Sequence, residues 1–335
     1  MERALMASSS SLSQSLKFIT TEFTNRCVIP ASVAAWRPTP TKLSTPKLIF
    51  TVTPAAQPVP PLYCSASSRH HITAAYYHSN QASVDNKILK LVSGSHYLPH
   101  PDKEDRGGED ALFILTEEQA VGVADGVGGW AEVGINAGDY ARELMANSVV
   151  AIKGEPQSSI DPVKVLEKAY LSTKSQGSST ACILVLSDRG LHAANLGDSG
   201  FVVIRGGHTL FKSPIQQHGF NCCFQLQSGD GADLPSSAQT FTINVAHGDV
   251  IIAGTDGLFD NLYDGELTAL VVDAIGDNFE PQTTAQKIAV SARQRAQDKN
   301  KDTPFSDAAQ KAGYWYQGGK LDDITVVVSY VTAIH

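Results

Sequence analysis

The feature that most constrains this chain is the apolar run at residues 250–255 (VIIAGT), which ends at Asp256 and Gly257. A continuous apolar run of this length predicts a strand buried on both faces. A carboxylate at its tip lies at the edge of the core, where a charge is costly unless it is paired or binds a cation. Asp260 follows four residues later, so a helical turn would place both carboxylates on one face. On its own, the stretch would equally suit a turn with a capping Asp.

The same arrangement recurs along the chain, which favours a shared site over unrelated turns. The further acids at the ends of apolar runs are Asp125 after 121–124, Asp322 and Asp323 before 324–328, Asp198 between 194–196 and 200–205, and Glu109 and Asp110 before 111–115. A sandwich of two sheets could bring these strand ends together. Hard oxygen ligands without a cluster of His or Cys indicate Mg²⁺ or Mn²⁺ rather than zinc.

Six short motifs occur one after another between residues 109 and 325. They are Glu-Asp at 109–110, Asp-Gly-Val-Gly-Gly at 125–129, Gly-Ser-Ser-Thr-Ala at 177–181, Gly-Asp-Ser at 197–199, Thr-Asp-Gly-Leu-Phe-Asp at 255–260 and Asp-Asp-Ile-Thr at 322–325. In this order the chain resembles the metal-dependent serine/threonine phosphatases of the PPM or type 2C family, over roughly residues 88–332. The segments 125–130 and 318–323 resemble the plant organellar branch of that family.

The resemblance implies an α+β fold, a four-layer αββα sandwich with two central antiparallel sheets flanked by helices. It also implies hydrolysis of phosphoserine and phosphothreonine in a phosphoprotein substrate, by a water activated by two divalent ions, Mn²⁺ or Mg²⁺. The implied catalytic ligands are Asp125, which bridges both ions, and Asp256 and Asp322, which hold the second. The other implied metal-site groups are the Gly126 carbonyl on the first ion, Glu109 and Asp110 orienting metal-bound waters, and Asp198 and Asp260 with Asp256 at a third, weaker site.

Two departures from the family pattern affect the leaving group and the phosphate. The family commonly has His where this chain has Val127, so no general acid is evident there. Its phosphate-binding Arg precedes the Glu-Asp pair by one more residue than Arg106 does, so the role falls to Arg106 or to Lys103, although a solvated loop residue would look the same. His218 is a further candidate acid, but such a His is more often structural.

Residues 1–84 have the composition of an organellar presequence. They contain seven Lys or Arg against two acidic residues, are rich in Ser and Thr, and are dense in Pro from Pro30 to Pro61. An ordinary disordered tail is the alternative. We interpret 1–84 as a transit peptide and linker with a chloroplast address, a mitochondrial one being the alternative. Residues 85–335 are then the catalytic domain.

Charge and composition exclude several other classes of protein. The formal net charge is −8, and no basic patch is present, so we expect no nucleic-acid partner. The apolar stretches are too short for an integral membrane segment. No CxxC spacing is present, which predicts reduced thiols, with Cys182 a small core residue. We expect a monomer.

The periodicity of the remaining segments predicts their secondary structure. Helices are expected at 136–152, from Asp161-Pro162 to about Thr173, after Asp264, and at about 282–298. Strands are expected at 180–186, 191–195, 200–205, 208–212, 239–245, 249–255 and 323–332. The stretch 225–237 predicts a polar surface loop. Blocks of strands and helices favour α+β layers over a parallel βαβ sheet.

Two other functions use the same residues. A pseudophosphatase would retain the fold as a binding module without catalysis, but a binding surface has no need of so many converging carboxylates. A metal-dependent hydrolase of small phosphate esters would use the same site, and turnover of peptide against metabolite separates it from a protein phosphatase.

Overall fold

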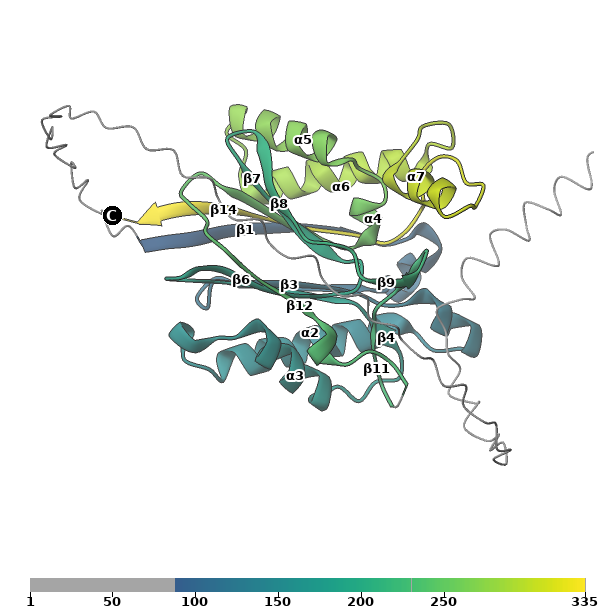
Figure 1. The fold of residues 1–335 in the computed structure, drawn as a ribbon, viewed down its shortest axis with the longest axis horizontal. Helices are drawn as coiled ribbons and strands as arrows, with labels where there is room; N and C mark the ends of the chain where they lie inside the picture. Colours follow the sequence, from purple (N-terminus) through teal and green to yellow (C-terminus); the bar gives the residue numbers. More distant parts are fainter. Residues whose placement is uncertain (1–87, 230, 335) are drawn as a thin grey trace, which may run out of the picture. The chain divides into compact units, whose positions relative to one another are not determined.

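Two five-stranded antiparallel sheets lie against one another between two layers of helices (Figure 1). The computed structural model describes residues 88–229 and 231–334, so the predicted leader at 1–84 lies outside the described residues. The first sheet has the order β1 (Ile88–Leu98), β14 (Ile324–Ile334), β13 (Val250–Gly254), β7 (Gly200–Arg205) and β8 (His208–Lys212). The second has the order β12 (Gln239–Ile243), β6 (Gly190–Leu196), β5 (Ala181–Ser187), β3 (Ala120–Asp125) and β2 (Asp110–Leu115).

Helices cover the outer face of each sheet, which confirms the expected four-layer αββα sandwich. On the second sheet lie α2 (Ala137–Lys153) and α3 (Pro162–Ser172), and on the first lie α5 (Asp264–Gly276) and α6 (Pro281–Gln297). The shorter elements are α4 (Asp256–Phe259), α7 (Pro304–Lys311), the strand pairs β4 (Ser178–Ser179) with β11 (Leu226–Gln227) and β9 (Gln217–Gly219) with β10 (Cys222–Cys223), and the 3₁₀ turns η2 (Pro101–Arg106), η3 (Gly128–Val133), η4 (Gln157–Ser159) and η5 (Pro235–Ser237).

The helix starts follow from capping residues in the sequence. The Asn136 side chain accepts a hydrogen bond from Gly138 N, and the Asp161 side chain accepts one from Val163 N at 3.0 Å. Each cap satisfies a backbone N–H that the first helical turn leaves without a partner. Pro162 suits the first position of α3, since that N–H is not needed there. The four helices predicted from periodicity are confirmed, and the helix ends that the sequence pattern predicted agree with the structure within one or two residues.

The core has three apolar layers, one between the sheets and one between each sheet and its helices. Every residue of β13 is buried, because this strand is central in its sheet and covered on both faces. This confirms the prediction for the run that precedes Asp256. Cys182 is buried in the layer between the sheets, also as predicted.

The segment 225–237 differs from the polar surface loop expected there. Leu226 is fully buried in the layer beneath the second sheet, and it pairs with Ser179 in the small sheet of β4 and β11. The buried Leu226 side chain therefore anchors a stretch whose other residues are mostly polar.

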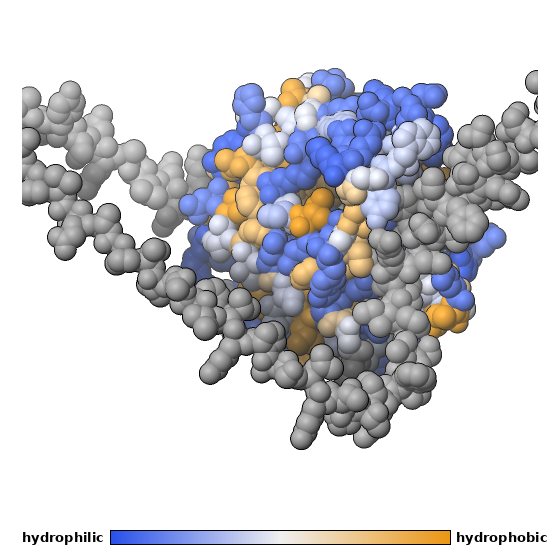
Figure 2. Space-filling view, turned by 45° about the vertical axis from the view of Figure 1, so that its right-hand side comes forward, coloured by the Kyte–Doolittle hydropathy of each residue, from blue (hydrophilic) through white to orange (hydrophobic). Residues whose placement is uncertain are grey.

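The surface of the described residues is mixed in polarity. In the face seen in Figure 2, charged and polar side chains predominate, with apolar ones scattered among them. Among the described residues, no helix combines the length and apolar character needed to span a membrane.

Candidate active site

The predicted acids converge at one end of the two sheets. Asp110 begins β2 and is paired in register with Asp125, which ends β3. Asp256 follows the end of β13, and Asp322 precedes the start of β14. Antiparallel pairing brings Asp110 next to Asp125 in one sheet and the end of β13 next to the start of β14 in the other, since the end of one strand meets the start of its neighbour. The packing of the two sheets against each other then places both pairs at the same edge.

A cleft of about 360 Å³ opens at this edge. Four of the predicted ligand carboxylates line it, those of Asp125, Asp198, Asp256 and Asp322. Among the other lining residues are Gly126, Val127, Gly128 and Gly129 of the Asp-Gly-Val-Gly-Gly motif, together with His100, Lys103, Thr180, Asn221, Cys223, Phe305, Tyr316, Lys320 and Leu321. Glu109 and Asp110 are buried beside the cleft, and Asp260 follows α4.

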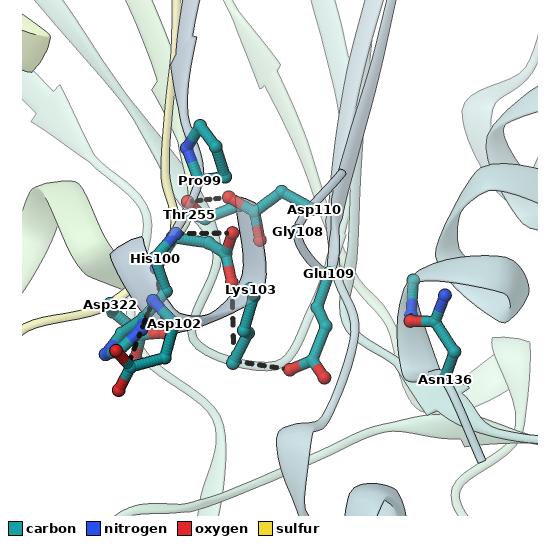
Figure 3. A network of polar contacts seen from close by, with 12 residues as sticks. Pro99, His100, Asp102, Lys103, Gly108, Glu109, Asp110, Asn136, Thr255 and Asp322 are labelled. Carbon is teal, nitrogen blue, oxygen red and sulfur yellow. Dashed lines mark hydrogen bonds and ion pairs between the residues drawn. The ribbon is translucent and has the colours of Figure 1, made fainter. Parts of the chain in front are cut away.

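Asp110 is held in place by two buried threonine hydroxyls from the other sheet. Thr255 Oγ1 donates to Asp110 Oδ2 at 2.8 Å, and Thr325 Oγ1 donates to the same oxygen at 2.7 Å (Figure 3 shows Thr255 beside Asp110). The hydroxyl of Thr255 also accepts from Thr325 N at 3.1 Å. These bonds tie the two sheets together at the site and fix one oxygen of the carboxylate.

Three buried carboxylate oxygens of the described residues have no hydrogen-bond partner, namely Glu109 Oε1, Asp110 Oδ1 and Asp256 Oδ1. A buried acceptor without a partner is destabilising, and it is explained by a water or an ion that satisfies it. Within residues 88–229 and 231–334, no group of three or more His, Cys, Asp or Glu side chains has the geometry of a metal site. The all-oxygen donor set fits Mg²⁺ or Mn²⁺.

Three of these acids have raised pKa values, first because they are buried and second because other carboxylates lie nearby. Burial, together with the charges of Asp256 and Asp110, raises the pKa of Asp125 well above its usual range. Burial and the charge of Asp256 raise the pKa of Asp198 to about 6. Burial also raises the pKa of Asp260 to about 7, even though Lys320 acts to lower it. A cluster that favours protons this strongly is one that a bound cation would stabilise.

Lys103 is the basic residue that the η2 turn directs toward the acids. Its Nζ donates to Glu109 Oε2 at 2.5 Å and lies 3.3 Å from Asp323 Oδ2 (Figure 3). Asp323 is in turn fixed by His100 N, which donates to Oδ1 at 3.0 Å. Arg106, the first choice for a phosphate-binding residue, is exposed and does not line the cleft, whereas Lys103 does. The lining of the cleft therefore favours Lys103 over Arg106 as the phosphate-binding residue.

Lys320 is a second cleft lysine, and the sequence reasoning assigned it no role. Its Nζ contacts the carboxylates of Asp256, Asp260 and Asp322. Burial would raise the pKa of Asp322, but Lys320 and Lys103 together hold it below its usual range. The sequence feature that distinguishes Lys320 is its surroundings, since two glycines directly precede it and Asp322 and Asp323 follow it.

The two candidate positions for a general acid lie in different surroundings. Val127 is half-buried and lines the cleft. His218 is 54% exposed, is not among the residues lining the cleft, and its Nε2 lies 3.0 Å from Asp233 Oδ2. Its ring stacks on Phe224 with centroids 4.1 Å apart. This arrangement favours a structural role for His218 in the segment around β9 and β10.

Gly126 allows a close approach of backbone to backbone at the site. A Cβ at this position would lie 2.7 Å from the carbonyl oxygens of Ala137 and Glu109, closer than side-chain carbons pack. Its N–H donates to Glu109 O at 3.1 Å. The glycine after Asp125 therefore brings the acidic pair at 109–110 next to the end of β3.

The chain is similar to known proteins over about three quarters of its length. No family model matches the chain. A relative from Arabidopsis thaliana, probable protein phosphatase 2C 55, is 71% identical over 252 residues, which are 75% of this chain and 54% of the relative. Another, probable protein phosphatase 2C 26 from the same plant, is 35% identical over 258 residues, which are 73% of this chain and 85% of the relative. This chain belongs to the protein phosphatase 2C family.

The fold comparison extends to solved structures of protein phosphatases. The X-ray structure of the photosystem II phosphatase PBCP is 36% identical, with a TM-score of 0.68, and the match covers 73% of this chain and 100% of that one. The catalytic domain of the phosphatase PstP, in complex with two manganese ions, shares the fold at 14% identity and a TM-score of 0.50. This protein phosphatase 2C chain spans 54% and 60% of the first two curated relatives it matches.

Proposed function

We propose that this chain is a metal-dependent protein serine/threonine phosphatase. The observation that carries the proposal is a cleft lined by four acids of the family motifs, with three buried carboxylate oxygens in and beside it that have no hydrogen-bond partner. Family membership supports it, because the curated relatives are described as probable protein phosphatases 2C. Hydrolysis of a phosphomonoester is among the slowest uncatalysed reactions, so a site of this kind must supply both a nucleophile and charge neutralisation.

The residues that would hold two divalent ions, Mn²⁺ or Mg²⁺, come from both sheets. Asp125 would bridge the ions, the Gly126 carbonyl would complete the first, and Asp256 and Asp322 would hold the second. The two manganese ions in the PstP complex support this choice of ion. Two divalent ions supply a water of lowered pKa and shield the phosphoryl oxygens.

The chain's own groups would then orient water and substrate. Two hydroxyls fix Asp110 Oδ2, which leaves Oδ1 to accept a hydrogen bond from a water at the site. Glu109 is placed in the same way, with one oxygen on Lys103 and the other without a partner. The ammonium of Lys103 lines the cleft and attracts the dianionic phosphate of the substrate.

A phosphorylated peptide is the substrate class that the family supports over a small phosphate ester. The full-length chain should release phosphate from phosphoserine and phosphothreonine peptides with Mn²⁺ or Mg²⁺, and EDTA should abolish the reaction. A matched assay on small phosphorylated metabolites measures the selectivity. Full activity in EDTA would exclude the two-ion site, and turnover of metabolites without turnover of peptides would assign the chain to small esters. Binding of phosphopeptide without turnover at any metal concentration would identify a pseudophosphatase.

We also propose a chloroplast address for residues 1–84, with 85–335 as the catalytic domain. The composition of the leader supports it, as does the likeness to a photosystem II phosphatase, since photosystem II is a chloroplast complex. Residues 1–84 fused to a fluorescent protein should direct it to plastids. A mitochondrial signal would support the alternative address, and a diffuse cytosolic signal would refute the presequence.

A further inference from the structure

The ammonium of Lys320 lies at the centre of three carboxylates. Its Nζ is 2.5 Å from Asp256 Oδ2, 2.8 Å from Asp260 Oδ2 and 3.2 Å from Asp322 Oδ2. An ammonium group has three N–H donors and no acceptor; here it donates hydrogen bonds to Asp256 and Asp260 and forms an ion pair with Asp322. The side chain is only 17% exposed, which sets it apart from an ordinary solvated lysine.

The rest of the residue is anchored independently of these ion pairs. Lys320 N donates to Asn261 Oδ1 at 3.1 Å, and Asn261 Nδ2 donates to Lys320 O at 2.8 Å. Asn261 is fully buried, so its amide clamps the backbone of Lys320 on both sides. The Nζ also lies 5.1 Å from the centroid of the Phe305 ring, within reach of a cation–π contact. The ammonium is therefore held in place from the backbone outward.

Asp256 divides its two oxygens between different neighbours. Oδ2 accepts from Lys320, while Oδ1 is buried without a partner and remains available to a core ion. Asp260 contributes only to the Lys320 side, through its Oδ2. A positive charge already lies where a further ion would have to share Asp256 and Asp260, and two cations at one pair of carboxylates repel each other.

We propose that the Lys320 ammonium is a tethered cation that takes the outer cation position between Asp256 and Asp260. The chain then binds two divalent ions, where the resemblance to the family implies a third, weaker ion at Asp198, Asp256 and Asp260. This inference rests on the proposed function, since it assumes that the core ions bind. The inference goes beyond the proposed function because it assigns the outer cation position to a residue of the chain itself.

The test is the number of Mn²⁺ ions bound by the full-length protein, measured by equilibrium dialysis and isothermal titration up to millimolar Mn²⁺. The wild type should bind two ions. Lys320→Met keeps the packing on Phe305 but removes the charge, and it should bind a third ion weakly. Adding Asp260→Asn to that variant should return the count to two, because the outer position loses a ligand.

Lys212→Met is the matched control. Lys212 also pairs with a carboxylate, Asp264, at 2.5 Å and lies 5.4 Å from the ring of Phe259, but it does not line the cleft. Its removal should leave the count at two. Circular dichroism establishes that each variant is folded, and Lys320→Gln replaces Lys320→Met if the latter is not.

The number of Mn²⁺ ions bound distinguishes a failure of the tethered cation from a failure of the proposed function. Three ions on the wild type, or two on a folded neutral variant of Lys320, would overturn the tethered cation while leaving the phosphatase proposal intact. No ions on the wild type, with no metal-dependent turnover, would overturn the proposed function and this inference with it. The wild-type count alone decides if no Lys320 variant folds.

Discussion

Removing the hydroxyl of Thr325 should weaken both the fold and the metal site. Thr325→Val keeps the shape of the side chain and removes one of the two hydroxyls that donate to Asp110 Oδ2. Both threonines are fully buried, so no bulk water replaces the lost donor. Loss of a hydrogen bond to a buried charged group destabilises a protein by about 1.5–3 kcal/mol.

Thr255→Val should destabilise the protein more than Thr325→Val, because the Thr255 hydroxyl takes part in two buried hydrogen bonds. Its hydroxyl donates to Asp110 and also accepts from Thr325 N, so its removal leaves a buried backbone N–H without a partner. That adds about 1–3 kcal/mol. Because partners that orient metal-site ligands typically affect binding by about 10–100-fold, both variants should also lose Mn²⁺ affinity on this scale.

Urea unfolding in EDTA gives the stability, and Mn²⁺ titration of the folded protein gives the affinity. Thr325→Ser should recover most of the affinity, since it restores the donor. Thr332→Val is a control on the same strand, where the hydroxyl makes only a 3.3 Å bond to Lys90 O, and it should change stability by less than about 0.5 kcal/mol. A folded Thr325→Val with wild-type stability and wild-type Mn²⁺ affinity would refute the role of this pair.

Three further predictions concern protons, phosphate and the leaving group. Burial and the charge of Asp256 raise the folded-state pKa values of Asp198 to about 6 and Asp260 to about 7, above an unfolded value of about 4. The contribution of these two acids to stability in EDTA should therefore be largest in acid and be lost as pH rises from about 4 to 7, and saturating Mn²⁺ should reduce this loss in melting curves of the wild type compared with an Asp198→Asn, Asp260→Asn variant. Lys103→Met should raise KM for a phosphopeptide by about tenfold, while Arg106→Met should leave it unchanged; equal effects would contradict the assignment of Lys103. His218→Ala should change kcat on phosphoserine less than about threefold, whereas a loss near 100-fold confined to alkyl phosphates would identify His218 as the general acid.

The acids of the site could be read from the sequence because a carboxylate at the end of a buried run has few explanations. Asp256 after 250–255 and Asp125 after 121–124 both lie at the ends of interior strands, one in each sheet, and the packing of the two sheets brings them to the same cleft. The fold was predictable for the same reason, since the apolar runs and helical stripes that carry it are long and regular.

Other parts of the molecule depend on contacts that no local pattern encodes. Lys320 lies in a loop, where a lysine is ordinarily solvated, and only the tertiary approach of three carboxylates gives it a role. The strand β1 was missed because it lies at the edge of its sheet and most of its residues are only partly buried, so its alternation is weak. Leu226 similarly anchors a mostly polar segment, as its fully buried apolar side chain packs in the core beneath the second sheet.

The most direct test of the metal-site account is turnover and melting temperature measured on the same sample of Asp125→Asn. Asp125 would touch both ions, so its replacement should remove nearly all phosphopeptide hydrolysis while the protein stays folded. Asp139→Asn is the matched control, since Asp139 is a surface acid paired with Arg142 at 2.7 Å, and it should retain full activity. An Asp125→Asn protein that melts like the wild type and remains fully active in Mn²⁺ would contradict the assignment of the site.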